Sequence, residues 1–243
     1  MNGQELCGSG ARAAQAAEPS AVQGASLYPG AMERPVLIVF DLDGTIADSR
    51  ELARQSYKHV FAQMGFGEIT DALADSFNGP SADEVCRIMG IGPDRRAQYD
   101  RLIDEIEVEL VHTIGRVYPG VHEMLADLSQ RAHLAILTNG SAAYCAACVA
   151  HYGFAPYIEL SAGYAVGVTK AARIGMWARA LGAQRVIVVG DRRTNIDNAR
   201  AAGAYAVGVT FGMGSREELS GADALCDTAR QVTQACLRVI EET

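Results

Sequence analysis

The sequence predicts an α/β fold, in which a Rossmann-like parallel sheet core carries an inserted all-α domain. Three observations support this. Short β-branched runs alternate with helical patterns from about residue 34 onward, one long stretch shows helical patterns only, and 243 residues suffice for one large or two small domains. Alternating strands and helices are typical of βαβ units, whose strands run parallel.

Four short apolar runs are predicted to be buried strands. They are Val36–Phe40, Leu134–Leu137, Val186–Val189 and Ala206–Val209. Helices are expected near Ala142–Tyr152, Ala171–Leu181 and Asn195–Ala202. We therefore expect the α/β core to comprise residues 34–49 and 116–243.

The stretch between these two parts of the core lacks a good strand pattern. Its apolar residues fall at helical spacing: Tyr57, Val60, Phe61, Met64, Ile103, Ile106, Leu110 and Ile114. Asn78-Gly79-Pro80 and Gly92-Pro93 interrupt the pattern. We expect a helical cap domain at residues 50–115, of a size that fits a small bundle.

Residues 1–33 are rich in Ala, Gly, Ser and Gln and show no periodicity, so we expect a disordered N-terminal tail. Gln15, Glu18 and Gln23 interrupt any apolar segment, and no basic region precedes them, so a signal peptide is not predicted. Met32 is a plausible alternative start, because ordered-looking sequence begins at Arg34.

Composition excludes several classes of partner. The net charge is -8 and no basic run is present, whereas a protein that binds a nucleic acid polymer needs a basic surface. No apolar run approaches the roughly 18 residues that span a bilayer. The six cysteines are scattered through a chain too large to need disulfides, so we expect reduced thiols and a cytoplasmic location. No pattern indicates an oligomeric state.

Three of the predicted strands are followed directly by polar side chains that could take part in catalysis or ligand binding. Asp41-Leu42-Asp43-Gly44-Thr45 follows the first, Thr138-Asn139-Gly140 the second, and Gly190-Asp191 the third. Ligands of open α/β sheets bind at the carboxyl ends of the strands. We therefore expect these segments to converge on one crevice.

The residue types at these positions indicate phosphate chemistry. Asp41 and Asp43 lie on one side of an extended strand end, and two nearby carboxylates acquire different pKa values and roles. Asp191 would complete an all-oxygen site suited to Mg²⁺. Gly44 permits a sharp turn whose exposed amides would cradle phosphate oxygens, and Thr138 adds a neutral donor. Lys170 adds positive charge.

Together these segments resemble the motifs of the haloacid dehalogenase superfamily. Asp41-Leu42-Asp43-Gly44-Thr45-Ile46-Ala47-Asp48-Ser49 is similar to the first motif, Thr138-Asn139-Gly140 to the second, and Gly190-Asp191-Arg192 to the fourth, while Lys170 stands where the third has its lysine. The segment from Thr210 to Asp223 resembles the tail segment of the phosphoglycolate-phosphatase-like subgroup. The expected helical insertion resembles the cap domain of the same subgroup. The resemblance covers about residues 34–230.

The resemblance implies a Mg²⁺-dependent phosphatase that acts on a small phosphorylated metabolite, with phosphoglycolate as the first candidate. Asp41 would attack phosphorus and form an aspartyl-phosphate, and Asp43 would be its acid and base. Thr138, Asn139 and Lys170 would bind phosphate. Asp41, the backbone carbonyl of Asp43, and Asp191 would bind Mg²⁺.

One position departs from the family pattern. The family often has an aspartate four residues after the equivalent of Asp191, where this chain has Asn195. Asp197 would be rotated to the far face of a helix and could not substitute. We expect Asn195 to hydrogen-bond a metal-bound water or to N-cap the helix, and to weaken Mg²⁺ affinity more than activity.

Other features favour structural interpretations. Cys145, Cys148 and His151 fall near one helix face, but they lack a second ligand pair and look like ordinary helix. Lys58 is expected at the surface, although a cap lysine can form a Schiff base. Asn78, Gly79 and Arg87 are weak candidates for substrate contacts.

The substrate and reaction remain open among related chemistries. A nucleotidase, a pyrophosphatase or a sugar-phosphate mutase would use the same core motifs. A 2-haloacid dehalogenase also uses an aspartate nucleophile, but Asp43, Asp191 and Lys170 would then lack a purpose. A non-catalytic binding protein is favoured only by Asn195.

Overall fold

The computed structural model describes residues 34–243, and the predicted tail at residues 1–33 lies outside this part. A six-stranded sheet, in which every neighbouring pair of strands is parallel, has the order β3-β2-β1-β4-β5-β6. Its strands are β1 (Val36–Phe40), β2 (His133–Leu137), β3 (Leu160–Ala162), β4 (Arg185–Gly190), β5 (Tyr205–Val209) and β6 (Ala224–Cys226). The predicted α/β class is confirmed.

The four predicted strands are all present, with ends that differ by at most one residue. The sequence analysis missed β3 and β6 because each has only three residues, too few to show a pattern. It also missed two helices that pack on the sheet, α5 (Val121–Ser129) and α9 (Ala229–Glu241).

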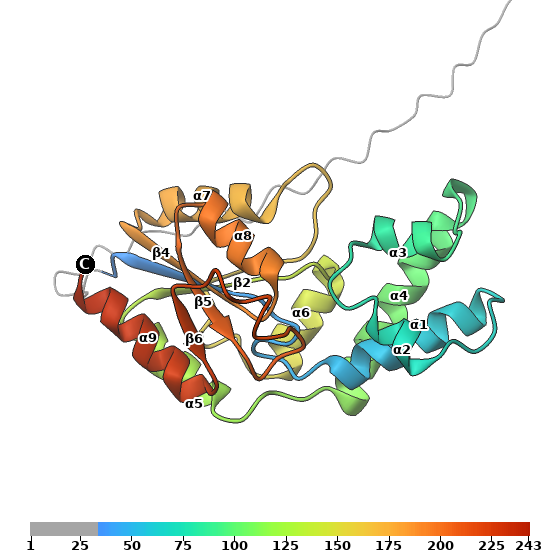
Figure 1. Ribbon diagram of the computed structural model, residues 1–243, viewed down its shortest axis with the longest axis horizontal. Coiled ribbons are helices and arrows are strands. Elements are labelled where there is room, and N and C mark those ends of the chain that lie inside the picture. The colour runs from blue at the N-terminus through green and yellow to red at the C-terminus, as the bar shows by residue number, and fades with distance from the viewer. Residues whose placement is uncertain (1–33) are drawn as a thin grey trace, which may run out of the picture. The chain divides into compact units, whose positions relative to one another are not determined.

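Helices cover both faces of the sheet (Figure 1). On one face lie α5, α9 and α6 (Ala142–His151), and on the other lie α7 (Lys170–Leu181) and α8 (Arg193–Ala201). Strand side chains alternate between the faces, so β1 buries residues on both sides and is fully apolar.

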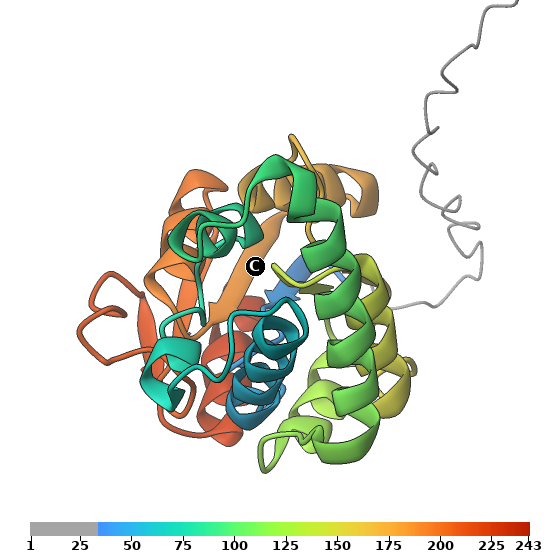
Figure 2. The ribbon, with the colours of Figure 1, turned by 90° about the vertical axis from the view of Figure 1, so that its right-hand side faces the viewer.

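Only helices form between β1 and α5, and we call them the helical insertion. They are α1 (Arg50–Gln63), α2 (Asp71–Asp75), α3 (Ala82–Ile88) and α4 (Pro93–Ile114). They enclose their own hydrophobic cluster, in which Phe61 stacks on Tyr99 with ring centroids 6.2 Å apart. Figure 2 shows this group of helices facing the viewer. Ala47 pairs with Val117, so the insertion leaves and rejoins the sheet domain at one place.

The order of the strands reverses at β1, because β2 lies on one side of it and β4 on the other. Such a reversal opens a crevice at the carboxyl ends of the strands. The cysteines among the described residues are all unpaired and buried, as expected for reduced thiols. No helix of residues 34–243 has the length and apolar character needed to cross a membrane.

Candidate active site

The strand ends meet at one cavity of about 390 Å³. Because β1 pairs with both β2 and β4, the residues that follow these three strands become neighbours. The predicted convergence is therefore found in the structure. The cavity is lined by Asp41, Asp43, Thr138, Asn139 and Asp191.

Asp41 has a donor on each carboxylate oxygen. Lys170 reaches it from the first turn of α7, with Nζ 2.9 Å from Oδ1. Asn195 donates from Nδ2 to Oδ2 at 2.8 Å. The Asp41 amide donates to the carbonyl of Val189 at 2.9 Å, which ties the residue to β4. Sequence reasoning found Lys170, and the structure explains its position by an ion pair with little solvent exposure.

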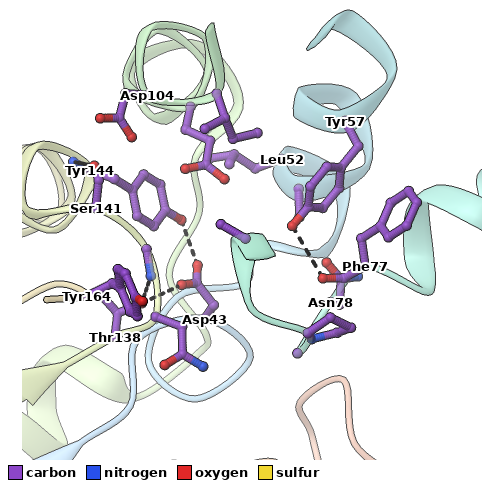
Figure 3. A pocket seen from close by; sticks show the side chains of 18 of the residues that line it. Asp43, Leu52, Tyr57, Phe77, Asn78, Asp104, Thr138, Ser141, Tyr144 and Tyr164 are labelled. Atoms are coloured by element: carbon purple, nitrogen blue, oxygen red, sulfur yellow. Dashed lines mark hydrogen bonds between the residues drawn. The ribbon is translucent and has the colours of Figure 1, made fainter. Parts of the chain in front are cut away.

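Asp43 faces a different pair of donors (Figure 3). Its Oδ2 accepts from the Thr138 hydroxyl at 3.0 Å, and its Oδ1 accepts from the Tyr144 hydroxyl at 2.6 Å. Burial raises the pKa of Asp43 above its ordinary value, although the hydrogen bond from Tyr144 opposes that rise. A carboxyl group with a raised pKa is suited to exchanging a proton near neutral pH. Sequence reasoning missed Tyr144, because no motif marks a tyrosine within the Ala-rich α6.

Asp191 is fully buried at the end of β4. Its Oδ2 accepts from the amides of Met213 and Gly214 at 2.8 and 3.3 Å. Burial raises its pKa to about 6, and the neighbouring negative charge of Asp41 contributes to that rise. Gly44 has φ +74°, and a Cβ there would lie 2.3 Å from Oδ2 of Asp191. Only glycine therefore fits against this carboxylate.

These groups fit a magnesium ion. Burial and the nearby charge of Asp41 both raise the pKa of Asp191, so keeping both carboxylates ionised costs free energy. A divalent cation bound between them would offset that cost. The side chain of Asp43 is turned toward Thr138 and Tyr144, so its backbone carbonyl is the group that would be available to a metal. Within residues 34–243 no group of three or more His, Cys, Asp or Glu side chains is placed to hold a metal ion.

Two predicted phosphate donors are already engaged. The amide of Gly44 donates to the carbonyl of Ala47 at 2.9 Å and the residue is buried, so it does not offer the exposed donor that was expected. The Thr138 hydroxyl, which donates to Asp43, also accepts from the Gly140 amide at 3.0 Å. Asn139 is exposed at the edge of the cavity.

Asn195 occupies the third position of α8 and is not its N-cap. The N-cap is Arg192, whose amide donates to Asn195 Oδ1 at 2.9 Å. Asn195 therefore accepts from an amide at the start of α8, but it does so from the third helical position and not as the N-cap. Its Nδ2 donates to Asp41, a contact that the sequence did not indicate. Asp197 is exposed, as predicted from its rotation on the helix.

The helical insertion supplies the remaining wall of the cavity. Tyr57, Asn78, Gly79, Asp104 and Glu107 line it from this side. Asn78 and Gly79 were weak candidates in the sequence and do lie at the cavity.

Of two arginines near this wall, Arg192 lines the cavity and Arg87 does not. Arg87, the third weak candidate, does not line the cavity and instead pairs with Glu84 on the surface. Arg192 was not singled out by the sequence. It contacts the carbonyl of Asn78 at 2.5 Å and Glu218 at 2.9 Å, and so joins the insertion to the sheet domain.

The cysteines of α6, His151 and Lys58 were expected to have structural roles, and none of them lines the cavity. Cys145 and Cys148 are buried in the main hydrophobic cluster, and burial raises the pKa of the Cys145 thiol to about 11. Such thiols are poor nucleophiles and metal ligands at neutral pH. His151 instead contacts His112 on α4. Lys58 forms an ion pair with Asp71 and does not line the cavity.

Comparisons with known proteins agree with this geometry. Residues 38–209 match the family described as haloacid dehalogenase-like hydrolase. The tyrosine-protein kinase PtkA of Mycobacterium tuberculosis is 28% identical over 188 residues, which cover 75% of this chain and 64% of that protein. The chain thus spans less than two thirds of the length of this relative.

Two other relatives are covered more fully. A phosphoglycolate phosphatase of Vibrio cholerae is 27% identical over 202 residues, covering 77% of this chain and 89% of that protein. A 5'-nucleotidase of Pseudomonas aeruginosa is 27% identical over 190 residues, covering 75% and 86%. The solved structure of a predicted phosphoglycolate phosphatase from Haemophilus somnus shares the fold, with TM-score 0.73, 22% identity, and coverage of 84% of this chain and 99% of that one.

A parallel sheet whose strand order reverses at β1, with Asp41 and Asp43 after β1 and Asp191 after the adjacent β4, defines an α/β protein with an aspartate-lined cavity at its strand ends. The chain belongs to the haloacid dehalogenase-like hydrolase family. The resemblance seen in its motifs is thereby confirmed.

Proposed function

We propose that this protein is a Mg²⁺-dependent phosphoric monoester hydrolase that acts on a small metabolite through an aspartyl-phosphate on Asp41. One observation carries the proposal: Asp41, bound by Lys170 at 2.9 Å, shares a cavity with Asp43, which has its own separate donors and a raised pKa. Two carboxyl groups held in such different environments are suited to two roles.

In the first step a carboxylate oxygen of Asp41 attacks phosphorus, and the bond from phosphorus to the ester oxygen breaks. Asp43, as the carboxylic acid, gives its proton to the leaving oxygen. In the second step the Asp43 carboxylate takes a proton from water, whose oxygen attacks phosphorus. The bond to Asp41 breaks and phosphate leaves, so both side chains return to their first state.

The surrounding residues hold and neutralise the phosphoryl group. Lys170, Thr138 and Asn139 are the proposed phosphate contacts, and Thr138 would exchange its hydrogen bond to Asp43 for one to phosphate. Asp41, the carbonyl of Asp43, and Asp191 would hold Mg²⁺, which neutralises charge on the phosphoryl oxygens. We also propose that residues 50–115 act as a cap domain over the core formed by residues 34–49 and 116–243.

A phosphate-release assay with and without a chelator tests this proposal. The wild type should release phosphate from some small monoesters only when Mg²⁺ is present, and Asp41→Asn should lose at least about a thousandfold in kcat. Asp197→Asn, which makes the same change on the exposed face of α8, is the matched control and should keep full activity.

A second measurement traps the intermediate. Asp43→Asn cannot activate water, and p-nitrophenyl phosphate has a leaving group good enough to need no acid in the first step. With this substrate, mass spectrometry of the acid-quenched variant should find phosphate on the peptide that contains Asp41. Full activity of Asp41→Asn, or rates that a chelator leaves unchanged, would refute the corresponding part of the proposal.

A further inference from the structure

The alcohol portion of the substrate must lie beside the helical insertion. In the proposed reaction Asp43 protonates the leaving oxygen, so the alcohol that departs is next to Asp43. The wall that faces Asp43 across the cavity comes from α4, whose Asp104 and Glu107 both line the cavity. Glu107 is close enough to Asp43 for the two charges to repel and to raise the pKa of Glu107. The chemistry of this wall therefore decides which alcohols fit.

The carboxyl groups of this wall have no cation beside them. Six carboxyl side chains and two guanidinium groups line the cavity. Arg96 is already paired with Asp83 and Asp100, and Arg192 with Glu218. Within the described residues, no Lys or Arg is among the groups that act on Asp104 or Glu107.

Burial makes this arrangement costly for the free protein. It raises the pKa of Glu107 well above its ordinary value, and it raises the pKa of Asp104. A carboxylate removed from water is normally paired with a cation or with hydrogen-bond donors. Mg²⁺ and Lys170 would offset Asp41, Asp43 and Asp191 at the other end of the cavity, where the ion pair of Lys170 is with Asp41.

Aromatic rings form much of the remaining lining. Tyr57, Phe77, Tyr144 and Tyr164 surround the space below Asp104 in Figure 3, and Tyr99 also lines it. Aromatic faces attract organic cations, and unpaired carboxylates do so more strongly. An ammonium group would favour the carboxylate forms of Asp104 and Glu107, whereas an anionic group would oppose their ionisation and would find no free cation on this wall.

We propose that the substrate is a phosphomonoester whose alcohol carries an organic ammonium group, which Glu107 and Asp104 bind within the aromatic lining. This inference rests on the proposed phosphatase function and specifies its substrate class. It disfavours phosphoglycolate, although relatives carry that name, because its carboxylate would be placed against the carboxyl groups of α4.

Three two-carbon esters test the proposal at constant size. In 2-aminoethyl phosphate, 2-hydroxyethyl phosphate and phosphoglycolate, the terminal group is an ammonium, a hydroxyl and a carboxylate. We expect kcat/KM to fall in that order, by about tenfold or more at each step. Phosphocholine, tested beside them, shows whether the site takes a quaternary as well as a primary ammonium.

Glu107→Gln keeps the shape of the side chain and removes its charge. It should lower kcat/KM for 2-aminoethyl phosphate by about 10- to 100-fold, change the hydroxyl ester by less than about threefold, and raise the rate with phosphoglycolate. Asp104→Asn should act in the same direction and serves if Glu107→Gln does not fold. Glu109→Gln, an exposed position on the same helix, is the matched control and should leave the order unchanged.

The outcomes separate this inference from the proposed function. A wild type that hydrolyses phosphoglycolate or the hydroxyl ester as well as the ammonium ester overturns the inference and leaves the phosphatase function standing. An equal loss on all three esters in Glu107→Gln indicates a structural role only and also overturns it. Absence of phosphate release from every ester would overturn both.

Discussion

Asp41 and Asp43 are distinguished by the side chains that surround each of them. Asp41 accepts hydrogen bonds from Lys170 and Asn195, while Asp43 accepts them from Thr138 and Tyr144. At the residue scale, therefore, the two members of the pair are distinguished by donors that arrive from other elements. Their spacing in the sequence makes them neighbours but does not assign their roles.

Tyr144→Phe should shift the pH dependence of turnover. The Tyr144 hydroxyl donates to the Asp43 carboxylate and so lowers its pKa, which means that its removal raises that pKa. Asp43 must be ionised to activate water, so the rising acid limb of kcat should move to higher pH. On that limb kcat should fall by roughly three- to tenfold, with recovery at higher pH.

The control for this variant is Tyr152→Phe. The Tyr152 hydroxyl is buried, and it has no hydrogen-bond partner among the described residues. Its removal should leave the pH profile in place. An acid limb that does not move in Tyr144→Phe would show that the 2.6 Å hydrogen bond has no part in the proton transfer.

Gly44→Ala should remove activity as well as stability. A Cβ at Gly44 would lie 2.3 Å from Asp191, and φ +74° strains any other residue. Gly203 has φ +67° with nothing within 4 Å, so Gly203→Ala has the backbone strain alone. Gly203→Ala should lose about 1–2 kcal/mol in urea unfolding, Gly44→Ala should lose more because of the added clash, and only Gly44→Ala should also lose phosphate release. Equal activity in the two variants would contradict the packing argument.

At the scale of elements, strand ends and helix starts build the site. The pair Asp41 and Asp43 follows β1, Thr138 follows β2, and Lys170 and Asn195 sit in the first turns of α7 and α8. Asn195 links two such elements, because its amide contacts both Asp41 and the amide of Arg192. Its replacement therefore affects α8 and the proposed metal site together.

Asn195→Asp should bind Mg²⁺ about three- to tenfold more tightly, as measured by calorimetric titration. The new carboxylate adds negative charge beside Asp41 and removes a donor to it. Without metal the variant should melt at a lower temperature than the wild type, because the added charge repels Asp41. Asn198→Asp makes the same change one turn of helix further on and should do neither. Unchanged Mg²⁺ affinity in Asn195→Asp would refute this.

At the scale of the whole molecule, the described residues have separate hydrophobic clusters in the helical insertion and around the sheet. Phe61 is fully buried in the insertion cluster, where it contacts Tyr57, Phe66, Phe77 and Tyr99. The cavity lies where residues of both groups meet. If residues 50–115 form a separate domain, as proposed, damage to the insertion cluster should loosen the insertion and leave the sheet intact.

Phe61→Ala should destabilise the insertion by about 3–5 kcal/mol, the usual cost of removing a buried aromatic side chain. Hydrogen exchange should speed up across residues 50–115 and remain slow in β1 and β4. Phe66→Ala removes a neighbouring ring that is 37% exposed and should cost less than about 1 kcal/mol. A uniform loss of protection across the chain would show that residues 50–115 are not a separate domain.

The sequence by itself determined the sheet, the helical insertion and the identity of the proposed chemistry. The strands are apolar runs buried on both faces, and Asp41, Thr138 and Asp191 follow three of them directly, so position along the chain was sufficient. Short elements such as β3 and β6 escaped because three residues hold too little pattern.

Only the tertiary structure decided what surrounds that chemistry. The hydrogen bond from Tyr144 to Asp43, the two contacts of Asn195, and the position of Glu107 opposite Asp43 join residues far apart in the chain. None of them belongs to a local pattern, because burial and charge at these points depend on how α4 and α6 pack. The residues of the proposed reaction thus lie near the strand ends, while the proposed substrate class depends on the packing of the insertion beside them.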